Sequence, residues 1–229
     1  MGSLDAVIFD FDGVIANSEP LHFAAFAWTL ETEGYALSRE DYYSRYLGYD
    51  DIGAFDAVAH DAGRPLTPLA VRALVDAKQR HMRTLLHEPA VLFPGAAQFI
   101  RSCAAAVPIA IASGALKSEI TEILQAADLE AVVSVVVAAG DTPKSKPSPA
   151  PYQRAFRLLN EAAGGRLRAE RTVAIEDSRW GLESARGAGL RLVGVTNSYG
   201  AENLPAAELI VSGLSALTLA MLEEMCNAR

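Results

Sequence analysis

The strongest constraint on the fold is an alternation of short apolar segments and helical segments that begins near residue 94. The expected strands span residues 107–112, 132–137, 172–175, 190–195 and 209–211. Helical patterns fill the intervals, at residues 116–127, 149–163, 178–187 and about 214–225. This alternation is typical of a parallel sheet with helices on both faces. The strands are continuously apolar, so both faces of the sheet are expected to be covered.

A further apolar strand is expected at residues 4–9, well before the others. Between residues 20 and 89, apolar residues such as Leu21, Phe23, Ala24 and Ala27 recur at helical spacing, and no strand is expected. We therefore predict an α/β fold with a parallel Rossmann-like sheet core and an inserted small α-helical cap domain. The core domain comprises residues 1–17 and 91–229, and the cap domain comprises residues 18–90.

The charge of the chain restricts its partners. The net charge is −8, which disfavours nucleic acid and anionic membranes. It also disfavours anionic small molecules, so a phosphate site would need local positive charge from a metal ion or a lysine. We expect a small phosphorylated metabolite as ligand, no nucleic-acid or membrane partner, and a monomer or weak homodimer.

Several features favour a cytoplasmic location. The N-terminal segment leads into an apolar strand without a basic region, so no signal peptide is expected. No apolar run approaches the ~18 residues that a membrane-spanning helix needs. Cys103 and Cys226 fit no CxxC pattern, and we expect two reduced thiols.

Polar residues follow four of the expected strands. Asp10 and Asp12 follow the first strand, Ser113 and Gly114 the second, and Glu176 and Asp177 the fourth; Lys146 lies in a proline-rich loop after the third. Active sites of open parallel sheets lie at the carboxyl ends of the strands. We therefore expect these residues to face one crevice.

Asp10 and Asp12 are two residues apart, a spacing that places both side chains on the same side of a strand. Carboxylates this close repel one another, and a divalent cation relieves the repulsion. An EF-hand loop is excluded, because it needs further oxygen ligands where this chain has Val14, Ile15 and Ala16. A plain turn is the remaining alternative.

Glu176 and Asp177 form a second acidic pair. On its own this pair could cap the helix expected from Ser178. Together with Asp10 and Asp12 it gives an oxygen-rich site suited to Mg²⁺.

The remaining two strand-end segments favour phosphate binding. A serine hydroxyl and backbone N–H groups at Ser113 and Gly114, where a strand leads into a helix, can bind phosphate, although an ordinary helix cap is the simpler interpretation. Lys146 lies between prolines and could hold a phosphate, although most lysines are simply solvated.

Together these segments resemble the motifs of the haloacid dehalogenase superfamily of phosphohydrolases. The resemblance covers essentially the whole chain and is carried by Asp10-Phe11-Asp12-Gly13-Val14, Ser113, Lys146-Pro147 and Glu176-Asp177-Ser178. The helical insert, with Ser18-Glu19-Pro20-Leu21-His22, is similar to the cap of the branch that contains phosphoglycolate phosphatases and β-phosphoglucomutases. Dehalogenating members lack the second aspartate, so the presence of Asp12 implies phosphate chemistry.

The resemblance implies a role for each matching residue. Asp10 is expected to be the nucleophile and Asp12 the general acid and base, while Ser113 and Lys146 contact the phosphoryl group. Substrate contacts are expected from Ser18, His22 and the N–H groups of Gly114 and Ala115. Mg²⁺ is expected to be bound by Asp10, the Asp12 backbone carbonyl and Asp177. Glu176 is expected to be a metal ligand through water or an orienting group. The expected reaction is Mg²⁺-dependent hydrolysis of a small phosphate monoester, such as a sugar phosphate or phosphoglycolate, through an aspartyl-phosphate.

Three alternatives stay open. A phosphomutase would use the same nucleophile, but the cap arginine of β-phosphoglucomutases is replaced by Asp51 when counted from Gly48, and no arginine follows before Arg64. A signalling phosphoacceptor similar to receiver domains would be about half as long and would lack a cap. A catalytically inactive binding protein would not require all four motifs. His22 is equally well explained as a surface histidine.

Overall fold

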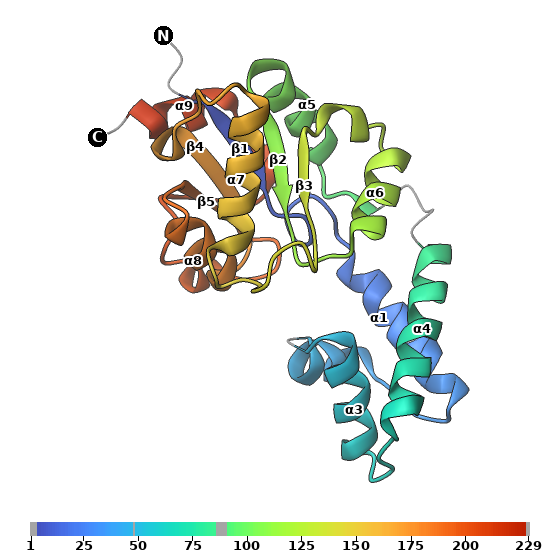
Figure 1. Ribbon diagram of the computed structural model, residues 1–229. Coiled ribbons are helices and arrows are strands. Elements are labelled where there is room, and N and C mark those ends of the chain that lie inside the picture. The colour runs from blue at the N-terminus through green and yellow to red at the C-terminus, as the bar shows by residue number, and fades with distance from the viewer. Residues whose placement is uncertain (1–3, 48, 86–90, 228–229) are drawn as a thin grey trace. The chain divides into compact units, whose positions relative to one another are not determined.

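The computed structural model describes residues 4–47, 49–85 and 91–227 (Figure 1). The chain divides into two compact units. The first, here called the core unit, comprises Met1–Asn17 and Pro89–Arg229, and the second, the helical unit, comprises Ser18–Glu88. Each unit is described by itself below.

The core unit contains a six-stranded parallel sheet with the strand order β3-β2-β1-β4-β5-β6. The strands are β1 (Ala6–Phe9), β2 (Ile109–Ala112), β3 (Val135–Val137), β4 (Thr172–Glu176), β5 (Arg191–Val195) and β6 (Leu209–Val211). The chain builds outward from β1 to β3, and then returns to build from β4 to β6 on the other side of β1. The carboxyl ends of β1 and β4 therefore lie at the topological switch point, where open α/β sheets bind their ligands.

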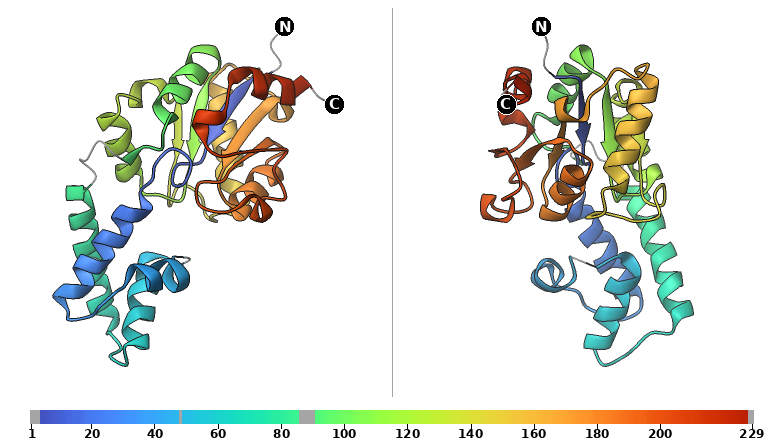
Figure 2. Two further views of the ribbon diagram at one scale, coloured as in Figure 1. Left: turned by 180° about the vertical axis from the view of Figure 1, so that it is seen from behind. Right: turned by 60° about the vertical axis from the view of Figure 1, so that its left-hand side comes forward.

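Helices cover both faces of this sheet, with α7 on one side and α9 on the other (Figure 2). The helices of the core unit are α5 (Ala96–Ala106), α6 (Lys117–Ala126), α7 (Ala150–Ala162), α8 (Arg179–Gly187) and α9 (Leu219–Asn227). Buried residues of the strands, such as Ile8 and Ala174, pack with Tyr152 and Leu182 from the helices in one apolar cluster. The predicted fold class is thus confirmed.

Two elements of the core unit differ most from the expected ranges. The strand expected at 132–137 covers only Val135–Val137, because Val132 ends a 3-10 turn in which the N–H of Val133 donates to the Glu130 carbonyl. The helix expected from about 214 is divided into a 3-10 turn, Leu214–Ala216, and α9. Leu217 between them is extended, and the Thr218 hydroxyl accepts a hydrogen bond from the N–H of Met221, which starts a new helix.

The helical unit is built from α1 (Glu19–Thr32), α2 (Arg39–Asp41), a π-helical turn (Tyr42–Tyr46), α3 (Asp51–Asp61) and α4 (Pro68–Leu85). No strand occurs among its described residues, as the helical spacing predicts, and Gly48 lies outside them. Aromatic residues fill its interior; the rings of Phe26 and Phe55 have centroids 4.9 Å apart. The unit therefore has an apolar core of its own.

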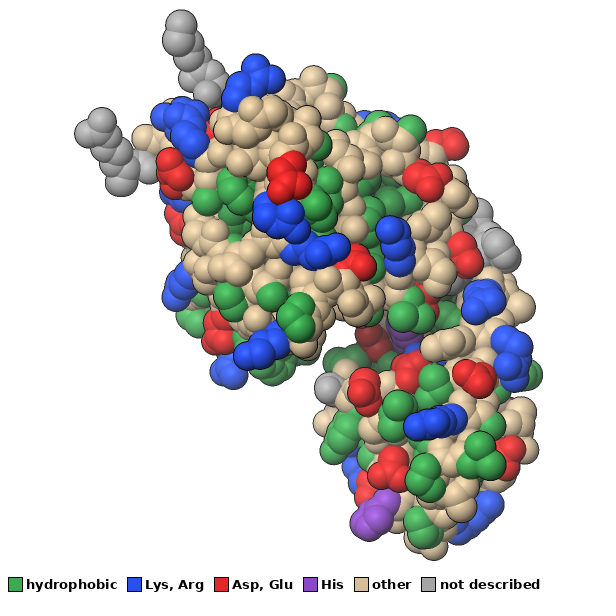
Figure 3. Space-filling model, viewed as in Figure 1, with side chains coloured by type: hydrophobic (Ala, Val, Ile, Leu, Met, Phe, Trp, Pro, Cys, Tyr) green, Lys and Arg blue, Asp and Glu red, His purple; other side chains and the backbone are tan. Residues whose placement is uncertain are grey.

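On the face shown in Figure 3, acidic and basic side chains are interspersed over the core unit. Within the described ranges, no helix combines the length and the apolar character that crossing a bilayer requires.

Cys103 is buried and Cys226 is half-buried, and both are free thiols. Burial raises the pKa of the Cys103 thiol to about 12, which disfavours the reactive thiolate at neutral pH.

Candidate active site

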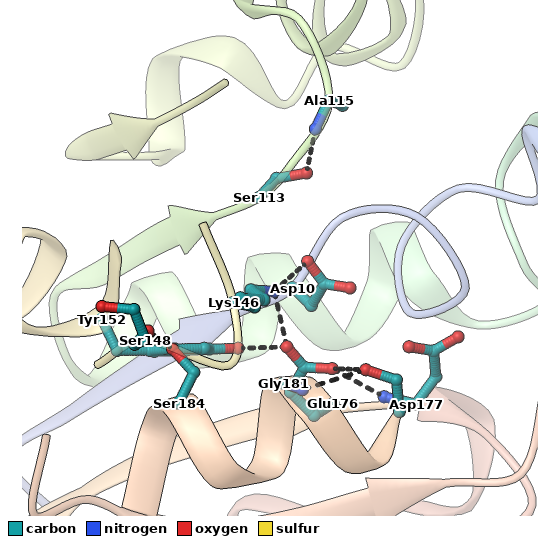
Figure 4. Close-up of polar contacts among 11 residues, drawn as sticks. Asp10, Ser113, Ala115, Lys146, Ser148, Tyr152, Glu176, Asp177, Gly181 and Ser184 are labelled. Atoms are coloured by element: carbon teal, nitrogen blue, oxygen red, sulfur yellow. Dashed lines mark hydrogen bonds and ion pairs between the residues drawn. The ribbon is translucent and has the colours of Figure 1, made fainter. Parts of the chain in front are cut away.

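The site begins with two neighbouring strands that end side by side. The register pairs Phe9 with Ile175, and the N–H of Asp10 donates to the Ile175 carbonyl at 2.9 Å. Asp10 and Glu176 are consequently the next residues on adjacent strands, at the carboxyl edge of the sheet. Both residues thus lie at the topological switch point of the sheet, and their side chains are drawn in Figure 4.

Lys146 joins these two carboxylates (Figure 4). Its Nζ atom donates to Asp10 Oδ1 at 2.6 Å and to Glu176 Oε1 at 2.5 Å. The side chain is only 15% exposed, and burial alone would lower the pKa of the ammonium. The two carboxylates outweigh burial and raise the pKa of Lys146, so the group carries a positive charge at neutral pH.

Asp177 completes a cluster of three buried carboxyl groups, in which one oxygen from each of Asp10, Glu176 and Asp177 lies within 4.8 Å of the others. Burial, followed by repulsion from Glu176, raises the pKa of Asp10 well above its usual range and that of Asp177 to about 7. One ammonium cannot balance three carboxylates in a buried site. The donor set consists of carboxylate oxygens, which are the ligands that Mg²⁺ prefers. The residues present therefore fit a divalent cation.

Two glycines permit this close approach. Gly13 has a positive φ of 79°, and a Cβ at this position would overlap the Asp177 carboxylate. A Cβ at Gly181, in the first turn of α8, would overlap the Glu176 carboxylate. The Asp177 side chain thus depends on a glycine far from it in sequence, and the Glu176 side chain depends on a glycine in the helix that follows it.

Ser113, Gly114 and Ala115 form the turn that follows β2. The N–H of Ser113 donates to the Val137 carbonyl, and its Oγ accepts from the N–H of Ala115 at 2.9 Å. In Figure 4, Ser113 and Ala115 lie on the β2 side of the cluster. The space around the Gly114 Cα is open, since a Cβ there would have no neighbour within 4 Å among the described residues. The turn could therefore admit a small anion.

Asp12 is half-buried and lies in the tight loop after β1. The N–H groups of Ile15 and Ala16 both donate to the Phe11 carbonyl, at 2.8 and 2.9 Å. Among the described residues, the cluster of three carboxylates does not include Asp12. The cluster suited to a cation thus consists of the other three carboxyl groups.

Two of the predicted substrate contacts, Ser18 and His22, belong to the helical unit. Ser18 precedes α1, and its carbonyl accepts the N–H of His22 at 3.0 Å. The Nδ1 atom of His22 lies 3.1 Å from Nζ of Lys78, which also pairs with Asp51. Burial and the Lys78 charge lower the pKa of His22 to about 3, so its ring is neutral. His22 is thus a member of a polar network within the helical unit rather than a solvated side chain.

A family model described as "Haloacid dehalogenase-like hydrolase" matches residues 7–195, a range that contains all four strand-end segments. The chain belongs to this family. The expected family and the expected phosphohydrolase class are both confirmed.

Relatives of this haloacid dehalogenase-like hydrolase match along almost its whole length. Protein CbbY of Rhodobacter capsulatus is 32% identical over 232 residues, covering 97% of this chain and 99% of that protein. A phosphatase of Thermotoga maritima named for phosphorylated carbohydrates is 30% identical over 85% of this chain and 87% of its own. A crystal structure of CbbY from Rhodobacter sphaeroides in complex with phosphate matches with a TM-score of 0.82 and 27% identity, over 96% of this chain and 99% of that chain.

The sequence does not predict that Tyr152 is part of the hydrolase site. Tyr152 of α7 is fully buried, and its hydroxyl donates to Glu176 Oε1 at 2.9 Å. Burial and the Glu176 charge raise the pKa of this phenol well above its usual range, so it remains a donor. A tyrosine on the apolar face of a helix predicts core packing, and no local pattern distinguishes it from any other core aromatic.

Proposed function

We propose that the protein is a Mg²⁺-dependent phosphatase that hydrolyses a small phosphate monoester through an aspartyl-phosphate on Asp10. The observation that carries the proposal is the contact of Lys146 with Asp10, inside a cluster of buried carboxylates at the switch point of the sheet. A sugar phosphate is the favoured substrate class. The Thermotoga maritima relative is named for phosphorylated carbohydrates, and a CbbY mutant from Rhodobacter sphaeroides is known in complex with xylulose-(1,5)bisphosphate.

Asp10, Asp177 and the backbone carbonyl of Asp12 would hold the cation, with Glu176 acting through water or as an orienting group. When bound, Mg²⁺ offsets the repulsion between the Asp10 carboxylate and the anionic phosphate. The pKa values of Asp10 and Asp177, raised first by burial and then by repulsion from Glu176, support this assignment, because a bound cation would stabilise both groups in their ionised form.

In the first step the Asp10 carboxylate attacks phosphorus, and the bond to the leaving oxygen breaks as Asp12 gives that oxygen a proton. In the second step Asp12 takes a proton from a water molecule that attacks the same phosphorus, and Asp10 is released with phosphate. Lys146, the Ser113 hydroxyl and the N–H groups of Gly114 and Ala115 would bind the non-bridging oxygens. These donors stabilise charge that builds up on the phosphoryl group.

The phosphomutase alternative receives less support from the helical unit. A mutase needs a cation that grips the second phosphate of a bisphosphate. Asp51 stands where a β-phosphoglucomutase-like cap would supply arginine, and its carboxylate pairs with Lys78. Lys78 is therefore already paired with a carboxylate inside the helical unit. Incubation with β-glucose 1-phosphate and its bisphosphate should release phosphate without isomerisation.

A panel of phosphorylated metabolites, assayed for released phosphate with Mg²⁺ or with EDTA, tests the proposed function. We expect release from sugar phosphates or phosphoglycolate with Mg²⁺ and loss of nearly all turnover with EDTA. Undiminished turnover in EDTA would contradict the metal assignment. Stable phosphorylation of the protein without phosphate release would favour a phosphoacceptor instead.

Mg²⁺ is expected to raise the Tm of the folded protein by ~5 °C at about pH 8. The rise in Tm should be smaller at about pH 5.5. The carboxyl of Asp177 has its pKa raised from 3.8 to about 7 on folding, so the folded state binds extra protons. Asp177 therefore stabilises the metal-free protein at low pH, and this contribution is lost as the pH rises from 3.8 to about 7. Above about pH 7, the ionised carboxylates of Asp10 and Asp177 would bind the cation, which offsets the repulsion between them.

Thermal denaturation in Mg²⁺ and in EDTA at both pH values measures this effect. Asp177→Asn should remove most of the Mg²⁺ shift. Asp5→Asn, which alters an ion pair with Arg168 elsewhere in the core unit, should leave the shift intact. Equal Mg²⁺ shifts at both pH values would contradict the assignment of these carboxyls to the metal.

A further inference from the structure

Glu176 is surrounded by hydrogen-bond donors (Figure 4). Its side chain is fully buried; Oε1 accepts from Lys146 at 2.5 Å and from Tyr152 at 2.9 Å. Oε2 accepts from the Ser178 hydroxyl at 3.1 Å and from the N–H of Asp177 at 3.2 Å. A carboxylate has about four lone-pair sites, and these donors approach both of its oxygens. The Glu176 side chain is consequently held in one orientation by these hydrogen bonds.

Tyr152 and Lys146 meet at the same oxygen of Glu176. The Tyr152 ring also lies beside the ammonium, with Nζ of Lys146 5.1 Å from the ring centroid. Tyr152 is held by the apolar core between α7 and the sheet, so its hydroxyl cannot follow Glu176 if the carboxylate moves. Lys146 reaches the site from a loop, and a hydrogen bond from Ser184 to the Ser148 carbonyl ties that loop to α8 at 2.6 Å.

We propose that Tyr152 is a positioning residue for the reaction: its hydroxyl occupies part of Glu176 Oε1, so that Glu176 does not draw the Lys146 ammonium away from Asp10. The inference rests on the proposed function. Lys146 is shared between two carboxylates, and its location depends on how strongly each one attracts it. The Tyr152 hydroxyl satisfies part of Glu176 Oε1 and so limits the attraction that Glu176 exerts on the ammonium.

Removal of the hydroxyl leaves Oε1 with Lys146 as its remaining donor among the contacts described. The ammonium then moves toward Glu176 and away from Asp10 and the phosphoryl group. Charge stabilisation by Lys146 acts mainly in the transition state, so the loss appears in kcat rather than in KM. A displacement of a catalytic group by ~1 Å can cost up to ~100-fold in rate.

Tyr152→Phe tests the inference, because it keeps the ring and its packing while removing the hydroxyl. We expect kcat to fall by ~10-fold to ~100-fold and KM to stay within ~2-fold. Tyr35→Phe is the matched control; Tyr35 is also buried, and its hydroxyl donates to the Arg64 carbonyl at 2.6 Å within the helical unit. Its kcat should equal that of the wild type.

A double-mutant cycle separates positioning from a general loss of structure. In a Lys146→Met background, Tyr152→Phe should reduce the residual kcat no further, since the group that it positions is gone. An equal loss in both backgrounds, or a Tyr152→Phe variant with wild-type kcat, would overturn the inference. Failure of the proposed function is a separate result, because the wild-type protein itself would then release no phosphate.

Discussion

Asp10→Asn is expected to abolish phosphate release, with kcat reduced by ~10⁵-fold or more. An amide is a poor nucleophile, and the substitution keeps the shape of the side chain and an oxygen that can accept from Lys146. It also removes one charge from a cluster whose burial raises the pKa of Asp10, so the metal-free variant should be at least as stable as the wild type at about pH 8. Loss of activity would then reflect lost chemistry rather than lost folding.

Two measurements make this prediction specific. Released phosphate gives turnover, and a fluoroberyllate adduct trapped on the wild-type protein should lie on Asp10 and be absent from the variant. Asp5→Asn is the matched control, since Asp5 binds Arg168 at 2.9 Å in the same unit and belongs to no proposed step. An adduct on another residue, or substantial turnover by Asp10→Asn, would contradict the nucleophile assignment.

The sequence predicts where the site residues that directly follow strands lie in the fold. Asp10 and Glu176 were expected at one edge because parallel strands end together, and they lie on paired strands. Lys146 was expected near them from its proline-rich loop, and it contacts both. Residues that follow strands can be placed from the sequence because the position of a strand end is set by the local apolar pattern and by the parallel topology.

The sequence does not predict how the side chains fit together. The hydroxyl of Tyr152 reaches Glu176 from a helix 24 residues away in sequence, and its apolar neighbours indicate only core packing. The need for glycine at 181 arises from the volume of the Glu176 carboxylate, which no local pattern reveals. In the helical unit, the Lys78 network with Asp51 and His22 depends on the packing of separate helices. Such features depend on tertiary contacts, which periodicity does not encode.

Asp12→Asn is expected to lower kcat by ~10²–10⁴-fold while leaving Mg²⁺ binding nearly unchanged. The carboxylate of Asp12 is proposed to move protons, whereas the cluster suited to the cation consists of Asp10, Glu176 and Asp177. The Mg²⁺-dependent rise in Tm should therefore persist in this variant. A lower kcat with an unchanged Mg²⁺-dependent rise in Tm would identify Asp12 as a general acid and base. Loss of both would identify its side chain as a metal ligand.

The leaving group provides a sharper test of the same residue. A sugar alcohol needs a proton as it departs, but p-nitrophenolate leaves without one, so Asp12→Asn should impair the first step much less for p-nitrophenyl phosphate. The second step still lacks its base, and the aspartyl-phosphate should accumulate after a burst of one nitrophenolate per protein molecule. Equal losses for both substrates without a burst would remove Asp12 from the acid role, because protonation of the departing oxygen is the one event that separates the two substrates.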